Sequence, residues 1–118
     1  AAPVEVTSED DRFLARVRDA IERLMGEEDF DLERLAHEAG VSRSHLFRRV
    51  KELLNETPEV LVRRLRLERA AQLLEQRAGS VGEIAYATGF KSVAYFCRVF
   101  RERFGATPGS WADRERAT

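Results

Sequence analysis

One segment of the chain combines side chains that bind anions with side chains that form cores. Residues 89–108 read GFKSVAYFCRVFRERFGATP, with four Phe in fifteen positions beside the four cations Lys91, Arg98, Arg101 and Arg103. Lys and Arg neutralise phosphates, and an Arg can hydrogen-bond a guanine edge through two nitrogens. The same composition also fits a buried helix or a helix that lies on a membrane surface. The rest of the chain must decide among these three interpretations.

Other kinds of chemistry are poorly represented in the sequence. There is no paired carboxylate in a pocket-like context, no nucleophile with an adjacent base and no glycine-rich phosphate loop, so we expect no catalytic residue and no cofactor. The single Cys97 cannot form an internal disulfide and has no neighbouring base. Together with His37 and His45 it makes a poor set of metal ligands, so no metal site is expected. These features argue against an enzyme.

Length and composition indicate one small domain, or two smaller subdomains that share a core. The chain has 118 residues, of which 43% are hydrophobic and 35% charged. Leu, Ala, Arg and Glu dominate without a long alternating apolar pattern, which favours an all-α fold. No apolar run approaches the roughly 18 residues of a membrane span, and the N-terminal AAPVEVTSEDD lacks the regions of a signal peptide. We therefore expect a cytoplasmic domain, cut from a longer protein, that makes no membrane contact.

Charge is unevenly distributed along the chain. Residues 1–39 hold five Arg against twelve Asp or Glu, a net charge of −7, whereas residues 40–118 hold fifteen Lys or Arg against nine Asp or Glu, a net charge of +6. A basic part of this size favours a polyanionic partner. A solvated charged surface explains the same charges equally well. Charge alone leaves both interpretations open.

Capping residues and apolar periodicity predict seven helices and no strand. Ser8 with Asp11, and Ser80 with Glu83, are predicted capping pairs, and two Thr-Pro steps open further helices because Pro is favoured in a first turn. The predicted helices run from Ser8 to Met25, between Asp31 and Gly40, between Ser42 and Asn55, from Pro58 to about Gln76, between Ser80 and Gly89, between Ser92 and Gly105, and from Pro108 onward.

The chain contains an internal repeat. The segment LAHEAGVSRSHLFRRVKELLNETP aligns with IAYATGFKSVAYFCRVFRERFGATP once the second copy is allowed one extra residue in the turn after its glycine. Gly40 and Gly89 are 49 residues apart, and beyond the turn the matched pairs, such as Arg48 and Arg98, are 50 residues apart. Two copies in register, each ending in Thr-Pro, are a far more specific signal than a single helical hairpin.

Each copy has the pattern of a helix-turn-helix. Ala36 and Ala85 are small where the two helices must cross closely, and the glycine provides the positive φ of the turn. Val41 and Phe90 are expected to fill the corner. The second helix of each copy then keeps one face free to enter a major groove of DNA.

These second helices have distinct inner and outer faces. In the later copy the phenylalanines fall on the inner face, and the cations do not flank a free apolar stripe, which excludes the membrane-surface interpretation. The predicted DNA-binding residues, on the outer faces and in the turn and cap of the later copy, are Arg43, Ser44, Phe47, Arg48, Lys51, Lys91, Ser92, Val93, Ala94, Cys97, Arg98 and Arg101.

Individual members of this set have different expected roles. Arg48 and Arg98 occupy matching positions, and each is predicted to contact O6 and N7 of a guanine. Phe47 is apolar on a face that is expected to be exposed to solvent. It either contacts a thymine methyl group or packs on a neighbouring loop. His45 either contacts a phosphate or is partly buried by packing.

The chain resembles the AraC/XylS family of bacterial transcription regulators over about residues 30–114. The resemblance rests on LAHEAGVSRSHLFRRVK, on RLRLERAAQLL and on IAYATGFKSVAYFCRVFRERFGATPGSW. It departs from the family pattern in an unusually acidic first helix and in Trp111, which stands where Tyr is commoner. We expect Trp111 to be largely buried near Phe100 and Phe104. The earlier segment SEDDRFLARVRDAIE is similar to the lead-in of output domains in hybrid two-component sensors.

This resemblance implies an all-α output domain that binds double-stranded DNA, regulates bacterial transcription and has RNA polymerase as a partner. It also implies a covalently attached N-terminal sensor or receiver domain of a two-component system, absent from this chain. The alternative function is a helical protein-interaction module without DNA binding. That module would require an exposed apolar patch, for which Phe47 is the candidate.

The predicted organisation has four parts. Residues 1–7 form a linker, 8–56 the first helix-turn-helix subdomain, 57–76 a linking helix, and 77–118 the second helix-turn-helix subdomain with a C-terminal helix. At 1.5 Å per residue the linking helix is roughly 28 Å long, close to the ~34 Å of one DNA turn. The two second helices are therefore expected to enter successive major-groove segments on one face of somewhat bent DNA.

Overall fold

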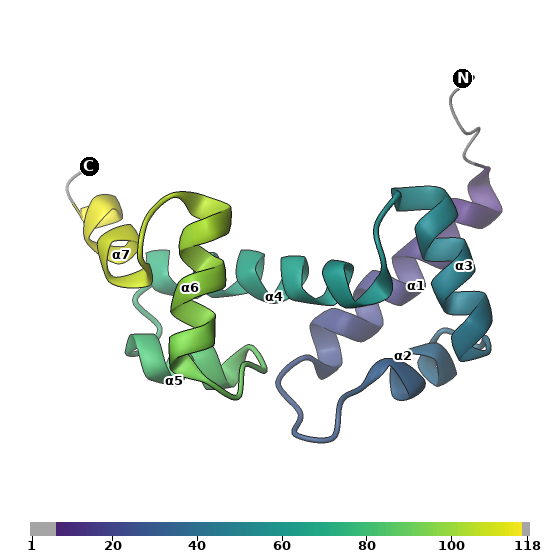
Figure 1. Ribbon diagram of the computed structural model, residues 1–118, viewed down its shortest axis with the longest axis horizontal. Coiled ribbons are helices and arrows are strands. Elements are labelled where there is room, and N and C mark those ends of the chain that lie inside the picture. Colours follow the sequence, from purple (N-terminus) through teal and green to yellow (C-terminus); the bar gives the residue numbers. More distant parts are fainter. Residues whose placement is uncertain (1–6, 117–118) are drawn as a thin grey trace. The chain divides into compact units, whose positions relative to one another are not determined.

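The computed structural model describes residues 7–116, which form seven α-helices and no strand (Figure 1). These are α1 (Ser8–Leu24), α2 (Leu32–Glu38), α3 (Arg43–Leu54), α4 (Pro58–Glu75), α5 (Val81–Ala87), α6 (Val93–Phe104) and α7 (Pro108–Arg116). The prediction of an all-α fold is confirmed. Residues 1–6 of the expected linker lie outside the described range. Within that range no helix has both the length and the apolar character needed to cross a membrane.

Two compact units divide the chain inside α4, one covering residues 1–64 and the other residues 65–118. The first unit holds α1, α2, α3 and the start of α4, and the second holds the rest of α4 with α5, α6 and α7. Each unit therefore contains one of the two repeated helix pairs together with part of α4.

The first helix is capped one residue earlier than predicted. Thr7, rather than Ser8, is the N-cap: its hydroxyl oxygen accepts a hydrogen bond of 3.1 Å from the Asp10 N–H, and the Asp10 carboxylate accepts one of 3.2 Å from the Thr7 N–H. Thr7 with Asp10 and Ser8 with Asp11 have the same spacing and equivalent side chains. Capping chemistry alone did not distinguish the two pairs.

The core of the first unit is formed by the apolar faces of its helices. α1 packs on α2, and α2 packs on α3. Leu54 is 36% exposed and lies in the last turn of α3, just before the left-handed Asn55 with φ of 56°. The buried side chains are Phe13, Val17, Ala20, Ile21, Leu24, Met25, Leu35, Ala36, Ala39, Leu46, Val50, Pro58, Leu61 and Val62.

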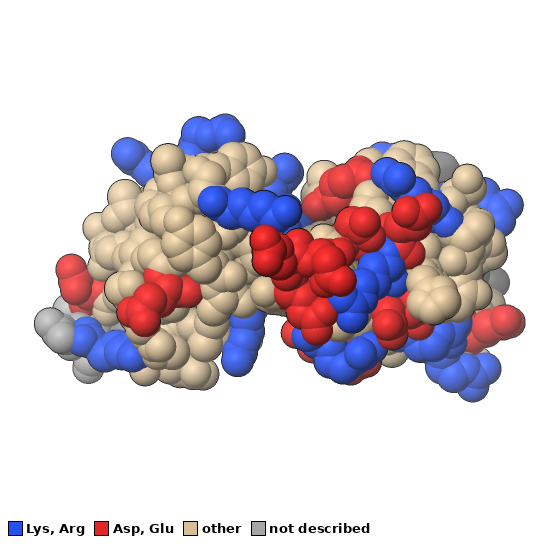
Figure 2. Space-filling view, turned by 90° about the horizontal axis from the view of Figure 1, so that it is seen from below, with Lys and Arg blue, Asp and Glu red and all other residues tan. Residues whose placement is uncertain are grey.

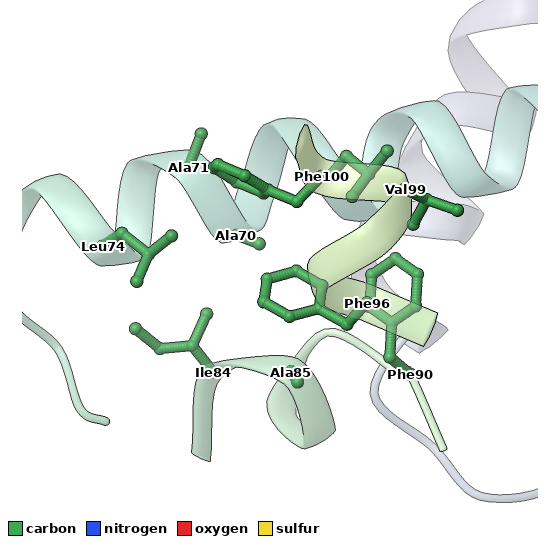
Figure 3. Close-up of a cluster of buried hydrophobic side chains, with 10 residues drawn as sticks. Ala70, Ala71, Leu74, Ile84, Ala85, Phe90, Phe96, Val99 and Phe100 are labelled. Carbon is green, nitrogen blue, oxygen red and sulfur yellow. The ribbon is translucent and has the colours of Figure 1, made fainter. Parts of the chain in front are cut away.

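The core of the second unit is built around phenylalanine rings (Figure 3). The Phe96 ring lies between those of Phe90 and Phe100, with centroid distances of 5.0 and 5.6 Å. Ala70 and Ala71 on α4 are small, which lets the rings approach that helix closely. The cluster consists of Leu67, Ala70, Ala71, Leu74, Ile84, Ala85, Phe90, Phe96, Val99 and Phe100. The phenylalanines of residues 89–104 are therefore core residues, as predicted.

Trp111 on α7 is less buried than predicted. Its ring does contact the two expected neighbours, with centroids 5.9 Å from Phe100 and 5.0 Å from Phe104. However, the side chain is only partly buried, and its indole Nε1 donates a hydrogen bond of 3.2 Å to Oε1 of Glu75, an exposed residue at the end of α4. The polar N–H of the indole is thus satisfied at the surface, which keeps one edge of the ring there.

Replacing Trp111 should therefore destabilise the protein by less than replacing a fully buried aromatic residue would. We expect Trp111→Ala to lower the free energy of unfolding by about 2 kcal/mol, below the 3–5 kcal/mol typical of core aromatics. Trp111→Phe should recover most of that loss, because a ring remains against Phe100 and Phe104. Denaturant unfolding followed by circular dichroism measures both values. An unchanged stability of the Ala variant would contradict this packing.

Candidate nucleic-acid interface

The first helix of each repeated pair ends in a similar backbone geometry at its glycine. Gly40 and Gly89 have positive φ values of 74° and 96°, which L side chains rarely adopt. In each copy the glycine N–H and the next N–H donate to carbonyls of the preceding helix, a standard ending for a helix with a left-handed residue. These hydrogen bonds, of 2.9–3.0 Å, join Gly40 to His37, Val41 to Ala36, Gly89 to Tyr86 and Phe90 to Ala85. The predicted glycine turns are confirmed.

The start of the second helix is also the same in both copies. Ser42 begins α3 and Ser92 begins α6, and each hydroxyl oxygen accepts a hydrogen bond of 3.1 Å from the N–H three residues later. Ala36 and Ala85, predicted to lie where the helices cross, are both buried. The second helices, α3 and α6, therefore begin at matched positions of the repeat.

Ten of the twelve predicted DNA-binding residues are exposed in the structure. The two exceptions are Val93 and Cys97, which are half-buried and pack against the core cluster of the second unit. For Cys97 this favours a packing role over a reactive one. The exposed residues are Arg43, Ser44, Phe47, Arg48, Lys51, Lys91, Ser92, Ala94, Arg98 and Arg101.

Large apolar side chains on the surface are more numerous than predicted. Phe47 is 47% exposed, so neighbouring loops leave much of its ring open to solvent. Tyr86 on α5 is 57% exposed and Tyr95 on α6 is 38% exposed. The expectation that Phe47 is the sole exposed apolar candidate was wrong, because tyrosine rings were not counted as apolar surface and Leu54 is exposed as well.

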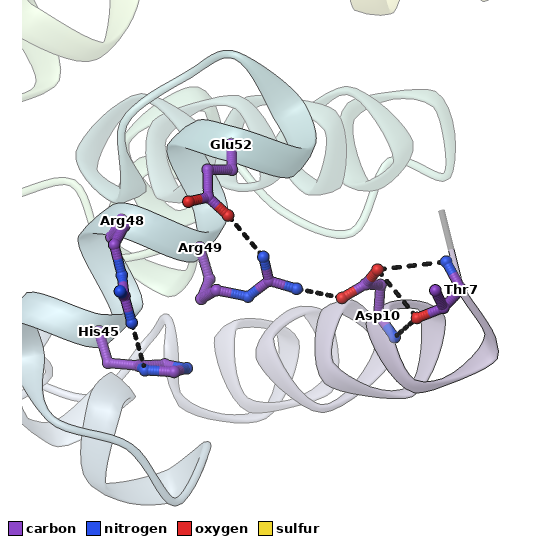
Figure 4. A network of polar contacts seen from close by, with 6 residues as sticks. All are labelled: Thr7, Asp10, His45, Arg48, Arg49 and Glu52. Carbon is purple, nitrogen blue, oxygen red and sulfur yellow. Dashed lines mark hydrogen bonds and ion pairs between the residues drawn. The ribbon is translucent and has the colours of Figure 1, made fainter. Parts of the chain in front are cut away.

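The two matched arginines, Arg48 and Arg98, have different neighbours. Nη2 of Arg48 lies 3.1 Å from Nδ1 of His45, on the same helix (Figure 4). The guanidinium carbon of Arg98 lies 5.2 Å from the centroid of the Tyr95 ring, and its Nη1 lies 3.4 Å from Oε1 of Glu102. Of the two roles proposed for His45 from the sequence, the structure supports packing, since its ring meets the Phe13 ring edge-on at 6.1 Å.

Arg49 joins α3 to α1, a role that was not predicted. Its guanidinium forms an ion pair with Asp10 of α1 and another, at 2.5 Å, with Glu52 (Figure 4). Hydrogen bonds from the Thr7 N–H and hydroxyl, followed by the charge of Arg49, lower the pKa of Asp10. The matched position in the second copy is the buried Val99. This difference between the copies was the available signal that Arg49 has a structural contact of its own.

Acidic residues of the first unit are partly neutralised within it. Arg34 lies 2.6 Å from Glu27 and 2.8 Å from Asp29, and Arg23 pairs with Glu38 at 3.3 Å. On the face shown in Figure 2, acidic and basic side chains are interspersed over the first unit, whereas the second unit is mostly uncharged there. The net charge of −7 in residues 1–39 therefore does not form one continuous acidic surface on this face.

A hollow on the surface of the second unit lies against the outer side of α6. It is lined by Cys97, Arg98, Arg101, Glu102 and Thr107. Two arginines beside an open hollow suit an anionic group such as a phosphate. Among the described residues, no three His, Cys, Asp or Glu side chains come together as a metal site.

Comparison with known proteins relates most of the chain to transcription regulators. A family model described as a helix-turn-helix domain matches residues 35–114. The chain is 41% identical over 97 residues to the HTH-type transcriptional regulator GlxA of Rhizobium meliloti, covering 82% of this chain and 28% of that protein. It is 37% identical over 111 residues to histidine kinase P4 of Formosa agariphila, covering 94% of this chain and 8% of that protein. The chain thus spans less than a third of either relative.

Solved structures of similar fold include DNA-binding domains. A transcriptional regulator with an AraC-type DNA-binding domain from Chromobacterium violaceum matches with a TM-score of 0.83 and 30% identity, over 92% of this chain and 96% of that one. The DNA-binding domain of the global transcriptional factor AdpA, solved in complex with a target DNA, matches with a TM-score of 0.76 and 32% identity, over 94% and 96% of the two chains.

The contacts of the Asp10 carboxylate, first its hydrogen bonds with Thr7 and then its ion pair with Arg49, give the first unit a stability that depends on pH. Because the folded-state pKa of Asp10 lies below its usual value, its stabilisation is complete above that usual value, about 3.9, and is lost as the pH falls further. Asp10→Asn should lower the melting temperature at pH 7, and the difference from wild type should close below about pH 4. Thermal unfolding at both pH values measures this.

Asp11→Asn is the matched control for this variant, since Asp11 is an exposed carboxylate in the same first turn of α1. It removes the same interaction with the helix dipole but leaves the contact with Arg49 in place. Because Asp10→Asn also weakens the capping bonds with Thr7, equal effects of the two substitutions at pH 7 would show that neither those bonds nor the ion pair stabilises the unit.

Proposed function

The chain belongs to the AraC/XylS family of helix-turn-helix DNA-binding transcription regulators, and we propose that it binds a specific double-stranded DNA site through both of its helix-turn-helix motifs. In this proposal α3 and α6 are the recognition helices, and they enter successive segments of the major groove. The organisation expected from the sequence, with subdomains at residues 8–56 and 77–118 joined by a linking helix at 57–76, is part of this proposal.

The observation that carries the proposal is the repetition of one recognition unit. Both copies have a left-handed glycine turn, a serine that caps the second helix and an exposed arginine at the same helical position, Arg48 or Arg98. A protein that bound DNA through a single helix-turn-helix would not need the glycine turn, the serine cap and the exposed arginine in two copies. A pair of matched motifs in one chain suits a DNA site that is not a palindrome.

We propose that α4 sets the spacing that this mode of binding requires. It is one uninterrupted helix of 18 residues, which at 1.5 Å per residue gives about 27 Å. One turn of DNA is about 34 Å long, so we propose that the two recognition helices bind about one turn apart and that the DNA bends to accommodate them.

The exposed residues divide by the DNA groups that they can reach. Arg48 and Arg98 are proposed to read guanine edges, and Phe47 a thymine methyl group. The remaining polar members are proposed to contact phosphates and to fix the position of the helices without reading sequence. Those are Arg43, Ser44, Lys51, Lys91, Ser92 and Arg101.

We also propose that the chain is the DNA-binding part of a longer regulator. The support is that its relatives are much longer proteins, of which it corresponds to 28% in GlxA and 8% in histidine kinase P4. An attached sensor or receiver region of a two-component system would then control DNA binding, and RNA polymerase would be the partner on which the bound regulator acts.

Substituting the two matched arginines tests whether both motifs read bases. Arg48→Ala should relax base preference in one half of the site and Arg98→Ala in the other, each by about 1–3 kcal/mol against the preferred base. The two affected positions should lie about 10 base pairs apart, because that spacing returns the major groove to the same face. Binding of each variant to a panel of single-base-substituted sites measures the effect.

Arg101→Ala is the control for these two variants. As a proposed phosphate contact it should weaken binding to every site in the panel by a similar factor. If Arg48→Ala and Arg98→Ala behave in this way too, both arginines are phosphate contacts. If only one of them changes base preference, a single motif carries recognition and the proposal of two reading helices fails.

The salt dependence of binding provides a separate test of the polyanionic partner. If the exposed cations neutralise about six phosphates, the logarithm of the association constant should fall against the logarithm of salt concentration with a slope of about −5. Titrations of one DNA site at several salt concentrations give the slope. A slope near zero would contradict binding to the DNA backbone.

A further inference from the structure

We propose that His45 and Tyr95 are positioning residues that hold the two base-reading arginines in place, each through a different kind of contact. This inference rests on the proposed function, since it assumes that Arg48 and Arg98 read bases. It assigns to each motif a residue that affects base specificity through its arginine and does not itself contact a base.

The internal repeat places these two aromatic residues at equivalent positions. His45 and Tyr95 are 50 residues apart, the same offset as Arg48 and Arg98, and each precedes its arginine by three residues. Side chains three residues apart are neighbours on a helix surface. Each aromatic ring can therefore contact the arginine that follows it one turn later.

Each of these rings is in turn anchored on a buried phenylalanine. His45 meets Phe13 of α1 edge-on, with centroids 6.1 Å apart, and Tyr95 meets Phe90 of the turn at 6.2 Å. Phe13 and Phe90 both belong to the core of their unit. In both motifs a core phenylalanine thus supports an aromatic ring that supports an arginine, although the two phenylalanines come from different parts of the fold.

In the first motif the contact is a hydrogen bond. The guanidinium of Arg48 has only donors, so a hydrogen bond across the 3.1 Å contact requires Nδ1 of His45 to be the acceptor (Figure 4). The bond uses one N–H of the arginine and restrains its direction. The other donors remain available for a base edge.

In the second motif the contact is made by a ring face. The Arg98 guanidinium carbon is 5.2 Å from the Tyr95 centroid, within the range of a cation–π interaction, which uses no N–H group. Glu102 is the other neighbour of Arg98, at 3.4 Å. Both side chains of this ion pair are largely exposed, and ion pairs between exposed side chains stabilise only weakly. The ring therefore restrains Arg98 while its donors stay free for bidentate contact with a guanine.

Restraint of this kind should increase discrimination between bases. A long arginine side chain loses rotamer freedom when it binds, and holding it near its bound conformation reduces that loss. Without the restraint, the arginine can also reach phosphates in other directions. We expect removal of either contact to reduce the ratio of affinities for the preferred and the substituted base by roughly 3- to 10-fold.

Two substitutions of His45 separate positioning from packing. His45→Asn keeps an acceptor oxygen close to the place of Nδ1 but loses the ring that packs on Phe13. His45→Leu keeps an apolar side chain against Phe13 but removes the acceptor. We expect the Asn variant to be less stable than wild type yet to retain base preference in its half of the site, and the Leu variant to lose that preference by roughly 3- to 10-fold.

For Tyr95 the matched pair is Tyr95→Phe, which keeps the ring face, and Tyr95→Leu, which does not. The Phe variant should retain base preference in the other half of the site, and the Leu variant should lose it. In the NMR spectrum of the 118-residue chain without DNA, the Tyr95 ring should shift the Arg98 side-chain protons upfield. This shift should persist in the Phe variant and vanish in the Leu variant.

The outcomes distinguish this inference from the proposed function. If wild type prefers certain bases but both Leu variants keep that preference, the positioning role is refuted while DNA recognition stands. If the Asn and Leu variants of His45 lose preference equally, packing on Phe13 is what matters, and the hydrogen bond does not position Arg48. If wild type has no base preference, the proposed function fails and the inference fails with it. An Arg98 shift that Tyr95→Leu leaves unchanged refutes the ring contact without any DNA experiment.

Discussion

The left-handed turn at Gly40 and at Gly89 is the constraint on which the rest of each unit depends. A positive φ at these positions lets two hydrogen bonds close the first helix and sends the chain directly into the second. The serine cap then fixes where the second helix starts, and the buried alanine lets the helices cross closely. With the crossing fixed, the position of each outward side chain, including Arg48 and Arg98, follows from helical periodicity.

The two copies share this frame but differ in what surrounds it. In the first, Arg49 forms ion pairs with the carboxylates of Asp10 and Glu52, and the pair with Asp10 connects α3 to α1. In the second, the matched Val99 is part of an aromatic core, and Glu102, which matches Glu52, lies beside Arg98 instead. The difference between Arg49 and Val99 thus changes two things: the contacts that support α3 or α6, and whether the matched glutamate lies beside the outward arginine.

Most of the fold could be predicted from the sequence because it depends on local signals. Caps, glycine stops and the repeat located all seven helices of the described range and both turns. What failed depended on geometry between elements: which of two equivalent capping pairs begins α1, how far Trp111 enters the core, and where Arg49 finds a partner. The contacts of His45 and Tyr95 with the arginines were also missed, although both residues occupy matched positions in the repeat, because a contact across one helical turn depends on the rotamers chosen by both side chains.

The central claim is that one chain carries two separate DNA-reading helices. Selection of bound sequences from a random pool of double-stranded DNA, with the 118-residue chain, tests it most directly. Two DNA-reading helices should enrich a site with two blocks of preferred bases whose centres lie about one helical turn apart, separated by positions of weak preference. A site with a single block would contradict the claim that both helices read DNA. A pool with no enriched sequence would contradict sequence-specific binding altogether.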